Sequence, residues 1–441
     1  MAELERQELS VRAERAVLVA LETRDIRFER EPLQELASLA STAGAEVVGR
    51  MAQRRPAPDT TFYIGRGKAE ELRDLVRALD ADVVIFDADL KPAQVRQLEE
   101  LTQIKVIDRT ELILDIFATR ARTTQAKLQV ELAQLEYAFP RLRAMWKHLE
   151  RIEGGIGARG PGEQQLESDR RIVRKRIESL RKSLLRIEDR TEREIRHRSE
   201  FLTISIVGYT NAGKSTLMNA LTDAGAFVED RLFATLDTRT RLWEIARGRR
   251  AFLSDTVGFI RDLPHHLVAS FHATLAEARE AHLLLHVADV SHSDVLQQVE
   301  SVEAVLREMG CQDKPRVTVL NKCDIVRGHE GRVILDGKLP ETVLVSARTG
   351  AGLEELRERV AGFVDSRSER SRISWAAGDG RILPYLSEHA TILEHGYSDS
   401  TEFARVQALP AVLGKLHKLF EGVRFEEGYR PRGEDDGPAG E

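Results

Sequence analysis

The chain has 441 residues, of which 42% are hydrophobic and 31% charged, and its formal net charge is −6. This length suits about three domains of ~150 residues each, and the negative charge argues against a protein that coats nucleic acid with its whole surface. No apolar run approaches the ~20 residues of a membrane-spanning helix, so no stable membrane insertion is expected. The N-terminus MAELERQELS lacks the features of a signal peptide, and the two cysteines give no disulfide or metal framework. A cytoplasmic protein is the resulting expectation.

Residues 1–119 alternate strand-like and helix-like patterns, which predicts an N-terminal α/β domain with a parallel sheet. Strands are expected at 16–21, 45–49, 82–87 and 105–108, and helices at 33–39 and 92–101. The piece Gly65-Arg66-Gly67-Lys68 looks like a fragment of a phosphate-binding loop, but it lacks the spacing and the following Ser or Thr. A helix start is the favoured interpretation, and nucleotide binding is the alternative.

Residues 120–200 change to a period of alternating three and four, which is a heptad pattern. Its apolar positions are Leu128, Leu132, Leu135, Phe139, Leu142, Trp146 and Leu149 in one arm, and Val173, Ile177, Leu180, Leu184 and Ile187 in the other. The glycine-rich stretch 154–162 lies between the arms, so the pattern predicts an antiparallel helical hairpin with a glycine-rich tip. Pro140 is expected to interrupt and bend the first arm.

The second arm is strongly basic. Residues 171–190 hold eight Lys or Arg and three acidic residues. Such a run is usually a solvated face, but next to a nucleotide-binding domain we favour contact with RNA phosphates. The candidate contact residues are Arg159, Arg171, Arg174, Lys175 and Arg176.

The stretch 208–216 reads GYTNAGKST and matches a phosphate-binding loop between a predicted strand at 201–207 and a predicted helix. Its backbone N–H groups would point at the β-phosphate. Lys214 would neutralise the β- and γ-phosphates, and Ser215 would coordinate Mg²⁺. The candidate phosphate-binding residues are Asn211, Ala212, Gly213, Lys214, Ser215, Thr216 and, from a later motif, Gly258. A glycine-rich turn that matches by chance is the alternative for this motif taken alone.

Three further motifs follow in the order that a GTP-binding domain requires, each after a predicted strand. Asp255 in Asp255-Thr256-Val257-Gly258 would hold Mg²⁺ through water. Asp324 would accept hydrogen bonds from the N1–H and the exocyclic 2-amino group of guanine, neither of which adenine carries. The candidate guanine-binding residues are Asn321, Lys322, Asp324, Ser346, Ala347 and Arg348.

Two positions bear on switching and hydrolysis. A threonine that senses Mg²⁺ and the γ-phosphate is expected between the first and third motifs, and Thr235 is preferred over Thr238 and Thr240. Ras-like enzymes place a water-orienting Gln directly after the third-motif glycine, and Phe259 occupies that position here. The catalytic group is therefore unknown, and hydrolysis is expected to be slow until a partner stimulates it.

Several segments together resemble the HflX family of ribosome-associated GTPases. They are residues 63–68, 84–90, 107–117, 154–167, 232–237 and 255–264. The resemblance implies binding to the large ribosomal subunit in the GTP state, with the hairpin tip near the peptidyl-transferase region, and splitting of stalled or idle ribosomes, often under stress. Three departures stand out: Gln164 replaces a Thr after the tip, Thr238-Arg239-Thr240 replaces Pro-Thr-Thr, and Arg348 replaces a Lys.

The expected architecture is α/β. A P-loop GTPase domain at 201–365 with a doubly wound, mostly parallel sheet would follow the N-terminal domain and the hairpin. A small C-terminal α/β module at 366–425 and a disordered tail at 426–441 would complete the chain. We expect a monomer that uses Mg²⁺, binds GTP and GDP, and acts on ribosomal RNA and not on DNA. A signalling switch acting on a protein partner and an RNA-binding chaperone remain the alternatives.

Overall fold

The computed structural model describes residues 14–23, 33–146, 161–197, 201–222, 239–260, 277–326, 339, 342–398 and 400–430. The chain divides into two compact units, which are described separately. The first consists mainly of residues 1–188, with the segments 229–237 and 262–273. The second contains the remaining residues.

The N-terminal domain is a four-stranded parallel sheet in the order β2-β1-β3-β4. Its elements are β1 (Arg15–Glu22), α2 (Gln34–Ala43), β2 (Glu46–Arg54), α3 (Arg66–Leu79), β3 (Val83–Phe86), α4 (Pro92–Thr102), β4 (Lys105–Asp108) and α5 (Arg109–Arg120). The strands β1 and β3 are almost entirely buried, as expected for a parallel sheet that helices cover. Gly65 is the N-cap of α3, so the Gly-Arg-Gly-Lys piece begins a helix.

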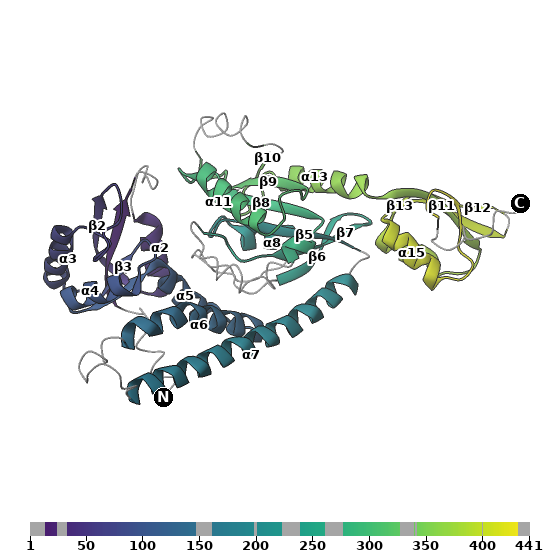
Figure 1. The fold of residues 1–441 in the computed structure, drawn as a ribbon. Helices are drawn as coiled ribbons and strands as arrows, with labels where there is room; N and C mark the ends of the chain where they lie inside the picture. Colours follow the sequence, from purple (N-terminus) through teal and green to yellow (C-terminus); the bar gives the residue numbers. More distant parts are fainter. Residues whose placement is uncertain are drawn as a thin grey trace, which may run out of the picture. The chain divides into compact units, whose positions relative to one another are not determined.

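The predicted hairpin is formed by α6 (Thr124–Trp146) and the long helix α7 (Pro161–His197), which run side by side in Figure 1. Its buried apolar seam joins Leu132 of α6 to Ile177, Leu180 and Leu184 of α7. The helix α6 continues through Pro140, so the predicted interruption is wrong. Its neighbour Phe139 packs against the seam, and this tertiary contact helps to keep the helix continuous despite the missing N–H donor.

The hairpin is tied to the N-terminal domain within the first unit. Arg141 of α6 donates hydrogen bonds to the Asp108 carboxylate at 2.8 Å and to the Leu90 carbonyl at 3.1 Å. Asp108 is fully buried and also caps α5 through the Glu111 N–H. This ion pair stabilises the position of α6 against the N-terminal domain, because separating the two would leave the buried Asp108 carboxylate without the Arg141 charge.

The second unit begins with a P-loop domain around a six-stranded sheet in the order β10-β9-β8-β5-β7-β6, where only β6 is antiparallel to its neighbour. Its elements are β5 (Leu202–Gly208), α8 (Lys214–Thr222), β6 (Arg239–Ala246), β7 (Arg249–Asp255), β8 (Leu283–Asp289), α11 (Val295–Glu308), β9 (Arg316–Asn321), β10 (Thr342–Leu344) and α13 (Leu353–Ser366). The core includes fully buried Ile204, Leu285 and Val319 on central strands, each of which contributes ~1.5–3 kcal/mol. This core fixes the carboxyl ends of β5, β7, β8 and β9 along one edge.

The C-terminal module is an antiparallel sheet in the order β12-β13-β11-β14, with two helices. Its elements are β11 (Glu369–Ala376), α14 (Ile382–His389), β12 (Thr391–Ser398), β13 (Thr401–Ala408), α15 (Pro410–Leu419) and β14 (Arg424–Glu427). The strand β14 includes residues 426 and 427, which the sequence assigned to the tail. Glu427 pairs with Arg372 of β11, so the sheet extends two residues further than predicted. The predicted tail beyond residue 430 lies outside the described residues.

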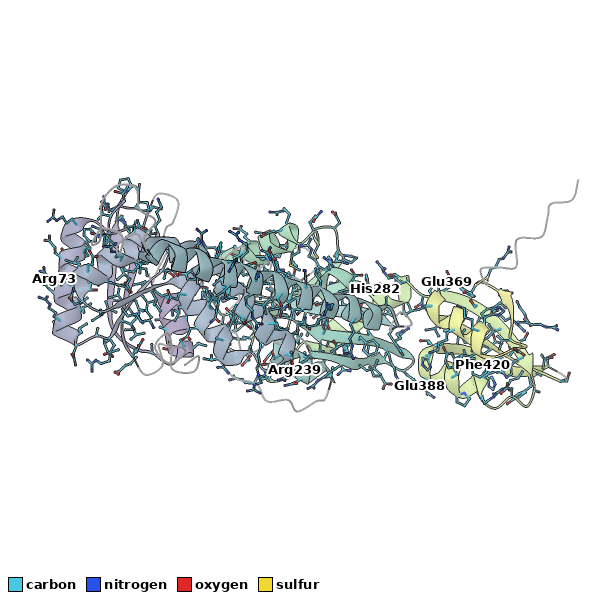
Figure 2. All side chains as sticks on the ribbon, turned by 60° about the horizontal axis from the view of Figure 1, so that its bottom comes forward. Arg73, Arg239, His282, Glu369, Glu388 and Phe420 are labelled. Atoms are coloured by element: carbon cyan, nitrogen blue, oxygen red, sulfur yellow. The ribbon has the colours of Figure 1, made fainter. Side chains whose placement is uncertain are left out.

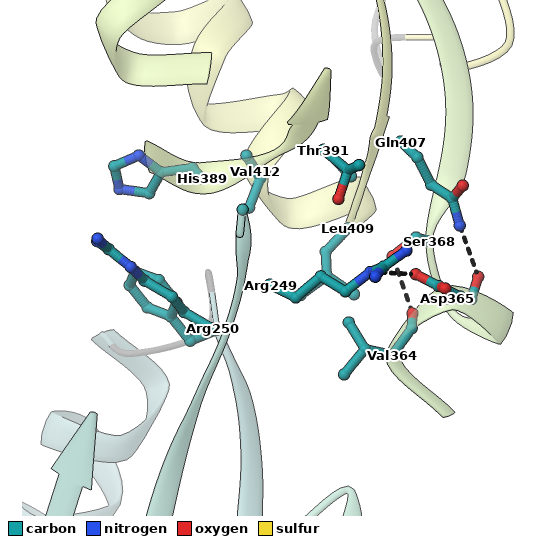
Figure 3. A pocket seen from close by; sticks show the side chains of 13 residues that line it. Arg249, Arg250, Val364, Asp365, Ser368, His389, Thr391, Gln407, Leu409 and Val412 are labelled. Atoms are coloured by element: carbon teal, nitrogen blue, oxygen red, sulfur yellow. Dashed lines mark hydrogen bonds and ion pairs between the residues drawn. The ribbon is translucent and has the colours of Figure 1, made fainter. Parts of the chain in front are cut away.

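The P-loop domain and the C-terminal module share a small pocket, shown in Figure 3. Arg249 of β7 pairs with Asp365 of α13 at 2.8 Å, and Arg250 pairs with Glu388 of α14 at 2.8 Å. Glu388 lies on the side of the module that is nearer the P-loop domain (Figure 2). At the turn between β6 and β7, a Cβ built on Gly248 would lie 2.2 Å from the Ala390 carbonyl oxygen, so the two backbones pack directly.

Candidate nucleotide-binding site

The loop between β5 and α8 has backbone conformations that its sequence permits. Gly213 has φ +91° and Asn211 has φ +60°, both in the left-handed region, which Gly and Asn tolerate best. A Cβ on Gly208 would lie 2.1 Å from the Val287 carbonyl oxygen of β8, and a Cβ on Gly213 would lie 2.2 Å from the Asn321 Nδ2 atom. Both glycines are therefore required by the close approach of neighbouring atoms.

Lys214 is the first residue of α8 and is buried. Its ammonium group donates hydrogen bonds to the carbonyl oxygens of Tyr209 at 2.8 Å and Gly208 at 3.2 Å, so it lies inside the loop. Burial lowers the pKa of Lys214 to about 8, although the nearby Asp255 carboxylate acts in the opposite direction. A phosphate group at this position would supply the negative charge that a buried ammonium requires.

The oxygen atoms expected to bind Mg²⁺ lie together. The Ser215 hydroxyl donates to the Asp255 Oδ2 atom at 2.5 Å, although the two residues are 40 positions apart in the chain. Asp255 is the last residue of β7 and is 1% exposed. A hydroxyl and a carboxylate are hard oxygen ligands that fit Mg²⁺, which usually takes one or two protein ligands plus phosphates and water. Thr235, the other predicted ligand, lies outside the described residues.

Backbone hydrogen bonds join the third motif to the phosphate-binding loop. The Phe259 N–H donates to the Gly208 carbonyl at 3.0 Å, and the Thr210 N–H donates to the Phe259 carbonyl at 2.7 Å. Phe259 is 2% exposed. Because its ring is buried and has no polar atom, it cannot orient a water molecule. Gly258 lies against the loop, where a Cβ would come within 2.9 Å of the Lys214 ammonium.

The guanine motifs also meet the loop. The Asn321 amide bridges two segments, since its Nδ2 donates to the Ala212 carbonyl at 2.9 Å and its Oδ1 accepts from the Ala347 N–H at 2.9 Å. Asp324 accepts hydrogen bonds from the Ser346 hydroxyl at 2.7 Å and from Arg348 at 2.5 Å. The hydrogen bond from Ser346 holds the pKa of Asp324 below its usual range. An ionised, pre-oriented acceptor is what recognition of guanine by Asp324 requires.

The remaining guanine candidate, Lys322, pairs with Asp289 of β8 at 2.7 Å and has φ +65°. Thr240, a runner-up for the switch threonine, lies in β6 and its hydroxyl donates to Glu277 at 3.1 Å. That hydroxyl is therefore engaged in this structure. Thr238, the other runner-up, lies outside the described residues.

The RNA-contact candidates differ in whether they form ion pairs within the protein. Arg176 pairs with Glu131 of α6 at 2.8 Å, and Arg181, which the sequence did not single out, pairs with Glu136 at 2.7 Å. Arg171, Arg174 and Lys175 are exposed. Arg174 also lies 5.8 Å from the centre of the Phe139 ring. Arg159 lies outside the described residues.

A basic ridge on α7 consists of Arg171, Lys175, Lys182 and Arg186, all exposed. At 100° per residue, these four positions fall within about 60° of arc. The seam residues Ile177, Leu180 and Leu184 fall on the opposite side of the helix. None of the four makes an ion pair within the described part of the chain, so the ridge presents four cations to the surroundings.

Comparisons with known proteins identify the family. Residues 30–118 match the family described as the GTP-binding GTPase N-terminal region, residues 120–198 match its middle region, and residues 203–322 match the 50S ribosome-binding GTPase family. The GTPase HflX of Escherichia coli K12 is 48% identical over 365 residues, which are 81% of this chain and 85% of that protein. The GTPase HflX of Caldanaerobacter subterraneus is 42% identical over 395 residues, which are 89% and 90% of the two chains.

The chain belongs to the GTPase HflX family. A GTP-binding protein of Sulfolobus solfataricus, solved in complex with GDP, is 25% identical over 79% of this chain and 98% of its own, with a TM-score of 0.42. Family membership confirms the predicted α/β fold with a P-loop GTPase domain and the predicted activity: this HflX-family protein binds guanine nucleotides and is a GTPase. Within the described residues, no helix has the length and apolar character to cross a bilayer.

One residue of the candidate site was not predicted from the sequence. Thr210 lies inside the phosphate-binding loop at a position that the pattern leaves free, so the motif gave no signal for it. Its backbone contact with Phe259 and its burial became visible only in three dimensions.

Proposed function

We propose that this HflX-family GTPase binds the large ribosomal subunit in its GTP state and splits stalled or idle ribosomes into subunits, with a role under stress. The observation that carries the proposal is that residues 203–322, which contain the phosphate-binding loop, match the 50S ribosome-binding GTPase family. A monomeric protein acting in the cytoplasm is part of the same proposal.

In the proposed site, the backbone N–H groups of the loop from Asn211 to Thr216 bind the phosphates, and Lys214 neutralises their charge. Ser215 and Asp255, whose Oγ and Oδ2 atoms lie 2.5 Å apart, would hold Mg²⁺, and Thr235 would join them in the GTP state. When bound, Mg²⁺ neutralises charge that develops on the phosphate oxygens. Gly258 donates its N–H to the γ-phosphate, so the segment after it changes when that phosphate leaves.

The proposed guanine contacts involve all three later segments. Asp324 accepts hydrogen bonds from the guanine base. The ion pair between Asp324 and Arg348 covers the base. The Ala347 N–H faces guanine O6, while Asn321, Lys322 and Ser346 orient these groups. The sequence difference of Arg at position 348 fits this role, because its guanidinium reaches the Asp324 carboxylate directly.

The proposed contact with ribosomal RNA uses the exposed basic side chains of α7. The ridge residues Arg171 and Lys175 are one helical turn apart, a rise of about 6 Å, which matches the spacing of neighbouring phosphates. Arg174 adds to this surface. Arg176 contributes less than the sequence suggests, because its guanidinium is paired with Glu131. Arg159 and the glycine-rich stretch 154–162 would add contacts at the tip.

The experiment is co-sedimentation with ribosomes in the presence of GDP or a non-hydrolysable GTP analogue, combined with light scattering to follow splitting. We expect the protein to pellet with large subunits in the GTP-analogue state and the scattering of intact ribosomes to fall. Asp324→Asn, which removes the guanine acceptor, is the matched control and should lose both effects. Equal pelleting with either nucleotide would contradict the proposal and favour a nucleotide-independent RNA chaperone.

A further inference from the structure

Phe259 leaves the GTPase without the usual water-orienting side chain, and the structure shows what it does in place of that role. Its ring is buried, and both of its backbone polar groups bond to the phosphate-binding loop, at Gly208 and at Thr210. Phe259 therefore fixes the first half of the loop against the third motif. The residue held most directly by this contact is Thr210, whose N–H bonds to the Phe259 carbonyl at 2.7 Å.

Thr210 lies at the γ-phosphate end of the proposed site. The second half of the loop faces the guanine motif, since the Ala212 carbonyl accepts from Asn321 at 2.9 Å. Thr210 lies beside Gly258 of the third motif: a Cβ built on Gly258 would lie 2.8 Å from the Thr210 Cγ2 atom, 2.9 Å from its Cα and 2.9 Å from the Lys214 Nζ atom. Thr210, Gly258 and the Lys214 ammonium therefore converge on one point, where the γ-phosphate of a bound nucleotide is expected.

The side chain of Thr210 is buried and its hydroxyl is not engaged. The residue is 5% exposed, and within the described part of the chain its Oγ1 atom has no hydrogen-bond partner. The buried hydroxyl of Thr256 in the same domain is engaged, since it donates to the Ile206 carbonyl at 2.7 Å, whereas that of Ser205 in β5, like that of Thr210, has no partner within the described residues. A buried hydroxyl normally has a partner, so an orphaned one in a substrate site indicates a partner that arrives with the substrate.

We propose that the Thr210 hydroxyl orients the attacking water in GTP hydrolysis, the role that Phe259 cannot fill. The hydroxyl accepts a hydrogen bond from the water and donates its own hydrogen to a γ-phosphate oxygen. The water oxygen forms a bond to the γ-phosphorus, the bond between that phosphorus and the β–γ bridging oxygen breaks, and GDP leaves with the electron pair. The proton of the water ends on the released phosphate, so Thr210 is unchanged. This inference rests on the proposed assignment of the nucleotide site.

The test compares three variants of the full-length protein by single-turnover GTP hydrolysis, alone and with large ribosomal subunits, and by titration with a fluorescent GTP analogue. Thr210→Val keeps the shape and removes the hydroxyl, and Thr210→Ser keeps the hydroxyl and removes the methyl group. We expect Val to lower the hydrolysis rate at least about tenfold, as loss of a positioned polar group does, while nucleotide affinity stays within about threefold. Ser should retain most of the rate.

The matched control is Thr222→Val, at the end of α8, where the lost hydroxyl donates to the Met218 carbonyl at 2.7 Å; its turnover should equal that of the unmodified protein. Undiminished turnover of Thr210→Val would overturn the inference, as would equal losses of rate and nucleotide affinity in both Thr210 variants, which would indicate a structural role. If no variant binds ribosomes, the proposed function fails while the rates without ribosomes still decide the role of Thr210.

Discussion

At the residue scale, the candidate site combines two charged groups in different environments. Lys214 is buried and has its pKa lowered to about 8, whereas Asp324 is kept ionised by its hydrogen bond from Ser346. The first group gains from a bound phosphate, and the second is prepared for the base before it arrives. Nucleotide binding is therefore expected to change the protonation of Lys214 and not that of Asp324.

The pH dependence of binding follows from Lys214. A nearby phosphate favours the charged form, so binding raises the pKa of Lys214 above its free value of about 8. At pH 8 about half of the free protein lacks this proton, and binding should take up roughly half a proton. The affinity for GTP should fall roughly fourfold between pH 7 and pH 8.5.

Calorimetry in buffers of different ionisation enthalpy measures this proton uptake. Lys214→Arg is the control, because its guanidinium stays charged throughout this range and any binding that remains should take up correspondingly less. If both proteins bind with the same proton count at pH 8, the low pKa assigned to Lys214 is wrong.

At the element scale, the hairpin and the β6–β7 turn show which contacts hold elements together. The heptad pattern identified the buried positions of α7 because the 3.5-residue period reports directly which face packs. It did not identify the cross-helix ion pairs of Arg176 and Arg181, since these depend on how the two helices are aligned. The predicted interruption at Pro140 was wrong for a related reason. Helix propensity is a local property of the sequence, whereas the packing of the adjacent Phe139 against the seam depends on the tertiary structure.

Two leucines of α7 provide a matched test of the hairpin seam. Leu180 is 2% exposed and Leu185 is 59% exposed. Leu180→Ala should reduce the local unfolding free energy by about 2–5 kcal/mol, because it leaves a cavity, whereas Leu185→Ala should change it by less than about 0.5 kcal/mol. Hydrogen exchange of the α7 amides measures both, and similar protection in the two variants would contradict the assigned seam.

Two glycines of the second unit test the contact between the P-loop domain and the C-terminal module. Gly248 has φ +74° and Gly350 has φ +84°, so an Ala at either position costs about 1–2 kcal/mol in backbone conformation. Only at Gly248 would the added Cβ meet another backbone, at 2.2 Å from the Ala390 oxygen, whereas nothing lies within 4 Å at Gly350.

Gly248→Ala should therefore lower the temperature of thermal unfolding more than Gly350→Ala, and it should selectively increase hydrogen exchange in β12. Equal effects of the two substitutions would show that the turn does not press on the module.

At the scale of the whole molecule, net charge is a poor guide to the partner. The chain carries −6 overall, yet the ridge of Arg171, Lys175, Lys182 and Arg186 places four cations on one side of α7. Local charge determines contact with a polyanion, because counterion release depends on the phosphates that are neutralised. The proposed ribosome binding should therefore depend on salt even though the protein is acidic.

Replacing the four ridge residues by Gln should weaken ribosome binding and reduce its dependence on salt concentration. Each lost phosphate contact reduces the magnitude of the slope of log affinity against log salt by about 0.7–0.9. The magnitude of the slope should therefore be smaller by about three in the quadruple variant. Co-sedimentation across a salt series measures the slope. As a control, Glu131→Gln frees Arg176 from its ion pair and should not reduce the slope. An unchanged slope in the quadruple variant would exclude the ridge from the interface.

The sequence by itself determined the order of the nucleotide motifs, the parallel sheets and the heptad arms, because each depends on residues close together in the chain. The tertiary structure decided which of those residues act together. It brought Ser215 to Asp255 across 40 positions and Asn321 to Ala212 across 109. It also paired Arg176 while leaving Arg171 and Lys175 exposed, and it joined the backbones of Phe259 and Thr210 by a hydrogen bond. These outcomes depend on packing between distant segments, and no local pattern of side chains encodes that packing.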